Sequence, residues 1–402
     1  MQILVLKKIC VLIASLLLFA NNTIAQKNSM SKIIDEAFKN ASSQYAGLIK
    51  EMSSTPGLLP HSILPDGSLH RVSPSSWVSG FFPGSLWYIY EYTGNVTVRK
   101  NAEKFTTYLK TQKNNNKTHD IGFMLYCSYG NKWRLCGKDK ETEDVLLSGA
   151  KALSSRFNVQ VGCIKSWDNK KWSYPVIIDN MMNLELLMWA YKTSGDPVFK
   201  NIAVRHADTT LKNHFRKDNS SYHVVSYNPK TGAVEKKETH QGYSNESAWA
   251  RGQAWGLYGY TMMYRETGNK SYLEMARKIA SFIIRHKNLP KDKIPYWDFD
   301  APNIPHAYRD VSAGAIICSA LIELSDYVKA DEADEYLAVA ETQLRALASP
   351  AYTAKPGTNK FFILKHSVGY LPGNREIDVP LSYADYYYLE AMLRFKDRVL
   401  KK

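Results

Sequence analysis

Two aspartates in the sequence stand where a carboxyl group could transfer protons. Asp120 follows a polar stretch at residues 114–116, and Asp179 follows three apolar residues at the start of an apolar helical segment. An apolar setting raises the pKa of a carboxyl group, so Asp179 could hold a proton near neutrality. One protonated and one ionised carboxyl group are what glycosidic bond chemistry requires. The alternative for Asp179 is a structural role as the N-terminal cap of its helix.

A cation and an indole lie close together later in the chain. Helical spacing places Ala248, Arg251 and Trp255 on one face of a helix. The planar fork of Arg251 suits a carboxylate, and Trp255 could stack on a sugar ring. The alternative is a buried Arg251 paired with Glu246 or another acid, together with a Trp255 that belongs to the core.

These residues must be positioned by helices, because apolar spacings of three and four recur from Trp77 almost to the C-terminus. Alternation typical of strands is rare. The exception is the segment 222–229, which predicts a short hairpin that ends in a turn. The chain is therefore expected to be all-α.

A glycine turn joins the predicted helices in pairs. Gly94, Gly195 and Gly268 each end a helix, and an Asn or Asp that can cap the next helix follows each of them. The first helix of a pair is apolar nearly all round and should be buried, whereas the second has a charged face. Repeated around a ring, this unit makes an α/α toroid with a ligand site at one mouth. The irregular spacing of the glycines favours a closed barrel over an open stack of repeats.

The N-terminus has the order of residues typical of a secretory signal peptide. Lys7 and Lys8 precede an apolar stretch at residues 9–20, and Thr23–Ala25 provides a cleavage site after Ala25. A membrane anchor is the alternative, but the apolar stretch is shorter than the roughly 20 residues of a spanning helix. We expect residues 1–25 to be removed, residues 26–402 to form one catalytic domain, and the protein to be periplasmic or secreted, with no membrane contact after cleavage.

The composition is that of a folded protein, with 45% hydrophobic and 22% charged residues. The formal charge of +14 favours anionic partners. The basic residues are scattered among acidic ones and no nucleic-acid motif is present, so no nucleic acid is expected and an acidic polysaccharide fits better. The four cysteines after residue 25 are too sparse for a disulfide framework, and no zinc-type spacing occurs, so no metal is expected.

Six motifs, in order along the chain, resemble those of the unsaturated glucuronyl hydrolases of glycoside hydrolase family 88. Together they cover nearly the whole expected mature chain. The motifs are Trp77–Gly84, His119–Phe123, Ile178–Asn183, His240–Tyr243, Trp249–Gly256 and Asp378–Tyr387.

The resemblance implies an (α/α)6 barrel of six inner and six outer helices. It also implies a hydrolase that needs no cofactor and releases a 4,5-unsaturated uronic acid from the non-reducing end of oligosaccharides cut by a lyase. Asp179 matches the general acid and base, and Asp120 matches the second aspartate. The positions that match substrate contacts are Trp77, His223, Gln241, Arg251, Trp255 and, more loosely, Trp167.

Two other readings remain open from the sequence. One is an unsaturated rhamnogalacturonyl hydrolase that acts on pectin fragments, and the other is an exported glycan-binding protein without catalysis. The polysaccharide that supplies the substrate and the oligomeric state are not readable. Lys365–Arg375 is expected to border a second sugar site, where Arg375 could meet a sulfate.

Overall fold

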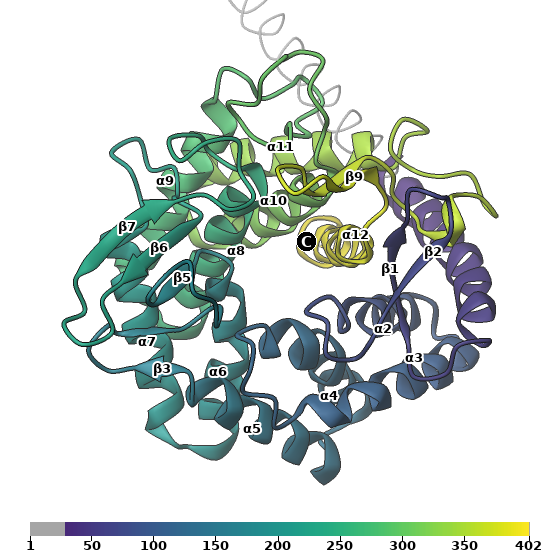
Figure 1. Ribbon diagram of the computed structural model, residues 1–402. Helices are drawn as coiled ribbons and strands as arrows, with labels where there is room; N and C mark the ends of the chain where they lie inside the picture. The colour runs from purple at the N-terminus through teal and green to yellow at the C-terminus, as the bar shows by residue number, and fades with distance from the viewer. Residues whose placement is uncertain (1–28, 402) are drawn as a thin grey trace, which may run out of the picture.

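Six inner helical segments form a closed ring in the computed structural model, which describes residues 29–401 (Figure 1). Each segment packs against the next, and the last packs against the first. Within the described residues this confirms the predicted (α/α)6 barrel. The inner segments are α2 (Phe81–Thr93), η2 (Gly122–Gly130), α6 (Asn180–Ser194), α8 (Ala250–Thr267), α10 (Val311–Leu324) and α12 (Ser382–Phe395).

The outer helices pack against these segments from outside. A helix at residues 29–52 completes the outer layer, where Tyr45 stacks on Phe82 and donates a hydrogen bond to Asp385 at 3.2 Å. The N-terminal helix thus joins the first and last inner helices. The other outer helices are α3 (Val96–Tyr108), α5 (Lys140–Ser154), α7 (Pro197–Asn213), α9 (Lys270–Arg285) and α11 (Ala330–Leu347).

Burial follows the predicted contrast between the two helices of a pair. In α6, every residue from Asn180 to Ala190 is buried except Glu185. In α9 only one face is buried, at positions three and four apart from Tyr272 to Ile283. The hydrophobic core therefore lies between the two rings.

The glycine turns adopt the predicted geometry. Gly94, Gly195 and Gly268 have φ values of 67°, 76° and 69° and end α2, α6 and α8. The following residues, Asn95, Asp196 and Asn269, cap the next helices with their side chains. Only glycine adopts this left-handed conformation without a steric cost, which accounts for its use at these turns.

The second inner segment, η2, is a π-helix and not the α-helix that the apolar spacing predicts. The side chain of Asn183 in α6 accepts a hydrogen bond from the backbone N–H of Phe123 at 2.9 Å. A Cβ on Gly122 would lie 2.6 Å from the Cα of Asn183, so the close approach of the two helices requires glycine. Single π turns occur often at functional sites, and this one begins two residues after Asp120.

Short strands form small antiparallel sheets in the connections that lead into the inner helices (Figure 1). The hairpin predicted at residues 222–229 is present, with β6 as its first strand. A third strand, β5, lies on the other edge of β6. The strands are β1 (Leu59–Ile63), β2 (Leu69–Val72), β3 (Phe157–Asn158), β4 (Cys163–Ile164), β5 (Pro175–Ile177), β6 (Val224–Tyr227), β7 (Val234–Glu238), β8 (Ser367–Tyr370) and β9 (Arg375–Val379).

Cys127, Cys136, Cys163 and Cys318 are free thiols, as expected for a chain stabilised by packing. Across residues 29–401, no helix has the length and apolarity needed to cross a membrane. The predicted signal peptide at residues 1–25 lies outside the described residues. Its cleavage and the location of the protein therefore stay predictions.

Candidate active site

A pocket of about 80 Å³ lies at the mouth formed by the N-terminal ends of the inner helices. It gathers six of the eight predicted site residues from segments far apart in the sequence. Two further residues, His119 and Ile177, complete its wall. The predicted residues in the wall are Trp77, Asp120, Trp167, Asp179, Gln241 and Arg251.

The pairing of β5 with β6 places Asp179 beside His223. Ile177 pairs with Val224, and the N–H of Ile178 donates to the carbonyl of His223 at 3.1 Å. Asp179 follows directly, at the N-cap position of α6, but its side chain makes no capping hydrogen bond. The side chain is therefore not used to cap the helix, which was the structural alternative.

Burial raises the pKa of Asp179 from its ordinary value of 3.8 to about 7. The positive charge of Arg251 opposes this shift, and the negative charge of Asp120 supports it. Only 8% of the residue is exposed, and Oδ2 has no hydrogen-bond partner among the described residues. Asp179 is thus a carboxyl group that holds its proton near neutral pH inside a pocket.

His223 presents an N–H group to this carboxyl. Its Nδ1 accepts hydrogen bonds from the backbone N–H groups of His240 and Gln241, both at 3.1 Å, so the ring hydrogen belongs on Nε2. Burial keeps the pKa of His223 well below its usual range, and the ring is neutral. Nε2 lies 3.8 Å from Oδ2 of Asp179, which is too far for a direct hydrogen bond.

Asp120 is held by its neighbours on both sides. The hydroxyl of Thr118 donates to its Oδ2 at 2.9 Å, and Nε2 of His119 lies 3.2 Å from its Oδ1. Nδ1 of His119 must carry a hydrogen, because it lies 2.9 Å from the carbonyl oxygen of Ser166. A neutral His119 would then present a lone pair to the carboxylate, so this contact requires a second, shared proton. Burial lowers the pKa of His119, although Asp120 opposes that shift.

Arg251 is largely occupied by the protein itself. Its Nη1 donates to Asp310 at 2.7 Å and to the carbonyl of Val368 at 2.5 Å, and its Nη2 donates to the carbonyl of Gly369 at 2.6 Å. The alternative of a buried pair with an acid is thus observed, and the acid is Asp310; Glu246 is exposed and lies near Arg216. Three of the five N–H groups are used, so two remain for a ligand in the pocket.

The rest of the wall combines rings and an amide. Trp167 meets the edge or face of His223 and His240 at centroid distances of 5.9 and 5.2 Å. Gln241 donates from Nε2 to the carbonyl of Gly369 at 3.0 Å. Trp77 lies across the pocket, partly exposed, and packs on Phe123. Such a wall, part aromatic and part polar, is suited to the two faces and the hydroxyl groups of a sugar.

The match to a family model settles the family. The model of Glycosyl Hydrolase Family 88 matches residues 60–393. The chain belongs to glycoside hydrolase family 88. It is therefore a glycoside hydrolase, as the six motifs predicted.

Family 88 relatives resemble the chain over most of its length. The unsaturated glucuronyl hydrolase of Formosa agariphila is 49% identical over 335 residues, which are 83% of each protein. The unsaturated chondroitin disaccharide hydrolase of Streptococcus agalactiae is 30% identical and covers 94% of each chain. A crystal structure of an unsaturated glucuronyl hydrolase specific for heparin has 52% identity and a TM-score of 0.88, and the match covers 91% of this chain and 97% of that one.

Trp255 lies beneath the pocket of this family 88 protein and not in its wall. It is wholly buried and packs between Phe123 and Tyr387 at centroid distances of 5.2 and 5.4 Å. Phe81 contacts Phe123 and Tyr387 in the same layer. We call these four residues the aromatic floor. The predicted stacking of Trp255 on a sugar is not supported by this position, because its rings already pack on the floor.

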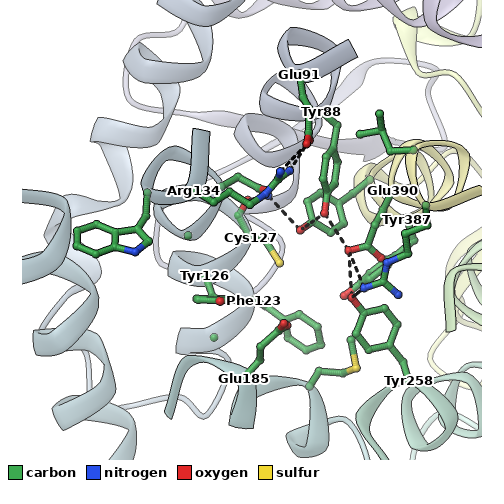
Figure 2. Close-up of a pocket in the computed structure, with 18 of the residues that line it drawn as sticks. Tyr88, Glu91, Phe123, Tyr126, Cys127, Arg134, Glu185, Tyr258, Tyr387 and Glu390 are labelled. Atoms are coloured by element: carbon green, nitrogen blue, oxygen red, sulfur yellow. Dashed lines mark hydrogen bonds and ion pairs between the residues drawn. The ribbon is translucent and has the colours of Figure 1, made fainter. Parts of the chain in front are cut away.

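A larger cavity of about 320 Å³ lies on the other side of the floor (Figure 2). It shares no lining residue with the pocket at the mouth. Its charged groups bind one another: Nη1 of Arg134 donates to Glu91 at 2.6 Å, and Glu390 accepts from the hydroxyls of Tyr88 and Tyr258 at 2.8 and 3.0 Å. Although larger, this cavity lacks the perturbed and unpaired carboxyl group of the pocket, and we place the chemistry at the mouth.

The sequence did not single out two residues that shape the site. Asp310 immediately precedes an inner helix, as Asp179 does, and the same argument applied to residues 310–311 would have found it. His119 was visible only as a neighbour of Asp120, and nothing in its spacing indicated the contact with Ser166.

Proposed function

We propose that this protein removes a 4,5-unsaturated uronic acid from the non-reducing end of glycosaminoglycan fragments left by a polysaccharide lyase. The observation that carries the proposal is the carboxyl group of Asp179, whose pKa is raised by burial to about 7 and whose Oδ2 is unpaired. Protonating a carbon atom needs a carboxylic acid that still holds its proton at working pH. The named activities of the relatives, on chondroitin disaccharides and on heparin, support the substrate class.

The reaction begins at the enol ether between C4 and C5 of the terminal sugar. Asp179 gives its proton to C4, and the electron pair of the double bond forms the new C–H bond. Positive charge then develops at C5 and is shared with the ring oxygen. Water attacks C5 and returns a proton to the Asp179 carboxylate, so the residue ends as it began. The hemiketal opens and frees the remaining sugar, and the uronate becomes a 4-deoxy-5-keto acid.

The neighbouring residues are assigned supporting roles by their positions. Asp120, fixed by Thr118 and His119, would accept hydrogen bonds from ring hydroxyls and favour the protonated form of Asp179. The Nε2–H of His223 would donate to a group that also contacts Asp179. The two free N–H groups of Arg251 would face the substrate carboxylate.

The remaining contacts follow from the composition of the wall. Trp77 and Trp167 would pack against the sugars, and Gln241 would bind a hydroxyl group. Arg375 lies on the β8–β9 hairpin, and we keep the proposal that it meets a sulfate on the second sugar. Equal activity of Arg375→Ala on sulfated and unsulfated disaccharides would refute that assignment.

The test is the ultraviolet band of the unsaturated uronate, followed with disaccharides from chondroitin, heparin and hyaluronan. Wild type should remove the band from at least one of them, and Asp179→Asn should not. Asp144→Asn, an exposed aspartate on α5, is the matched control and should retain activity. No loss of the band on any disaccharide would overturn the glycosaminoglycan assignment, and pectin fragments would be tried next. Binding without turnover of either would indicate a glycan-binding protein.

We also propose that the catalytic domain spans residues 26–402 and is exported. The support is the arrangement of Lys7, Lys8 and the apolar stretch before Ala25. N-terminal sequencing of the protein from the periplasm or medium should give Gln26 as the first residue. An intact Met1 on the active protein inside the cell would contradict the proposal.

A further inference from the structure

Three potential metal ligands that are far apart in the sequence meet beside the mouth of the barrel. A ring nitrogen of His61, a ring nitrogen of His70 and a carboxylate oxygen of Glu376 lie within 4.8 Å of one another. None of the three lines the catalytic pocket. We propose that His61, His70 and Glu376 bind a divalent transition-metal ion of the zinc type, which holds two hairpins of the mouth together.

A β-bulge turns the two histidines toward each other. His61 stands between Pro60 and Ser62, where the register of β1 against β2 shifts, and Ser62 pairs with His70. In a regular ladder, His61 would point to the face opposite that of Ser62 and His70. The extra residue of the bulge instead brings the two rings to a centroid distance of 5.1 Å.

Glu376 comes from β9, at the other end of the chain. Its Oε1 lies 2.6 Å from Nε2 of His61. Its Oε2 approaches the backbone so closely that a Cβ on Gly369 would lie 2.0 Å from it. A glycine at position 369 is therefore required for the carboxylate to reach the histidines.

His61 has an unmet hydrogen-bonding requirement in this cluster. The residue is only 4% exposed, and Nδ1 has no partner among the described residues. When Nε2–H donates to Glu376, the lone pair of Nδ1 remains buried without a donor. A cation is a partner that accepts such a lone pair, and a histidine hydrogen-bonded to a carboxylate is a common metal ligand.

The donor set fits the ion. Two imidazoles and one carboxylate form a recurrent zinc set, with the fourth position left to water or another ligand. Metal–ligand bonds of about 2.0–2.1 Å place tetrahedral ligand atoms about 3.4 Å apart. Side-chain rotations of about an ångström would close the present separations to that value.

The site would stabilise the catalytic pocket from outside. The β8–β9 hairpin that carries Glu376 also supplies the carbonyls of Val368 and Gly369, which bind Arg251. The β1–β2 hairpin precedes the first inner helix, and the β8–β9 hairpin precedes the last. A metal ion would therefore join the two ends of the barrel sequence and fix the orientation of Arg251.

The test is metal binding by tag-free, chelator-treated protein. Cobalt(II) is added while its visible absorption is followed, and zinc binding is measured by calorimetry. We expect one ion per chain, an affinity reduced by about tenfold or more in His70→Gln and in Glu376→Gln, and a melting temperature that rises with zinc only in wild type. Circular dichroism establishes that both variants are folded.

The control is His366→Gln, since His366 also pairs with a carboxylate, that of Asp378, at 2.6 Å. No third ligand is recorded beside that pair within the described residues, so this variant should bind cobalt as wild type does. Failure of wild type to bind either ion would overturn the proposal, as would equal affinities of wild type and His70→Gln. Either result would leave a histidine–carboxylate hydrogen bond as the full account of the cluster.

Discussion

Nη1 of Arg251 lies 2.7 Å from Oδ2 of Asp310, and these side chains are 1% and 0% exposed. The other carboxylate oxygen of Asp310 accepts from the N–H groups of Ser312 and Ala313 and caps α10. One buried ion pair thus connects the start of α8, the start of α10 and the β8 carbonyls. The orientation of the only arginine in the pocket wall depends on this pair.

Asp310→Asn should destabilise the protein strongly, because it leaves the charge of Arg251 buried without its counter-ion. The expected loss is about 3–5 kcal/mol in the free energy of unfolding, measured in urea. Glu246→Gln is the control, since Glu246 is 83% exposed and lies 3.9 Å from Arg216; its effect should stay within about 1 kcal/mol. Equal effects of the two substitutions would contradict the assigned role of Asp310.

Asp179→Asn should abolish turnover without a loss of stability. The folded protein binds a proton at Asp179 up to about pH 7, whereas the unfolded chain releases it near pH 3.8. The folded state therefore loses stability relative to the variant as pH rises from about 4 to 7, and the advantage of Asp179→Asn should grow over that range.

Asp385→Asn provides the matched comparison for that measurement. Burial also raises the pKa of Asp385 to about 7, but its carboxylate accepts from the N–H groups of Ile363 and Leu364 and from the hydroxyl of Tyr45. Replacing it should cost about 1–3 kcal/mol, because buried donors lose their acceptor. A stabilised Asp385→Asn together with a destabilised Asp179→Asn would reverse the assignment.

The pH profile of kcat/KM should report the proton of Asp179. Activity should fall as pH rises through about 7, where the acid ionises. Asp120→Asn removes a negative charge that raises this pKa, so the fall should begin at lower pH, in addition to any loss of rate. Asp144→Asn should leave the profile in place. A shift to higher pH in Asp120→Asn would show that the two carboxyl groups are not coupled as described.

Gly195→Ala should destabilise the fold through the backbone alone. Gly195 has a φ of 76°, and an added Cβ would meet no atom within 4 Å. The expected loss is about 1–2 kcal/mol, with kcat unchanged, because the turn lies at the far end of α6 from Asp179. Gly195→Asn should lose less, since Asn tolerates the left-handed region. If the two variants were equally stable, the cost would not arise from φ.

The sequence predicted those parts of the structure that rest on local pattern. Burial of α6, the glycine caps and the convergence of Asp120 and Asp179 all follow from spacing and from the position of residues before inner helices. The π-helical form of η2 depends on a contact between Phe123 and Asn183, 60 residues apart, and no local propensity encodes it.

The position of Trp255 and the partner of Arg251 could not be read from helical spacing. Spacing places both on one face of α8 but does not show which neighbours cover that face. Tyr387 and Phe123 enclose the indole, and Asp310 and the β8 carbonyls occupy the guanidinium. Each partner comes from a distant segment that is brought near only by closure of the ring.

The aromatic floor gives the barrel a direction. Phe81, Phe123, Trp255 and Tyr387 are each at most 2% exposed and close the lumen below Asp179. A polymer cannot thread through such a ring; it can only insert one terminus, and the released monosaccharide must leave by the opening through which it entered. Departure of that product and arrival of the next chain end therefore share a single doorway, and each turnover must empty it before another can begin.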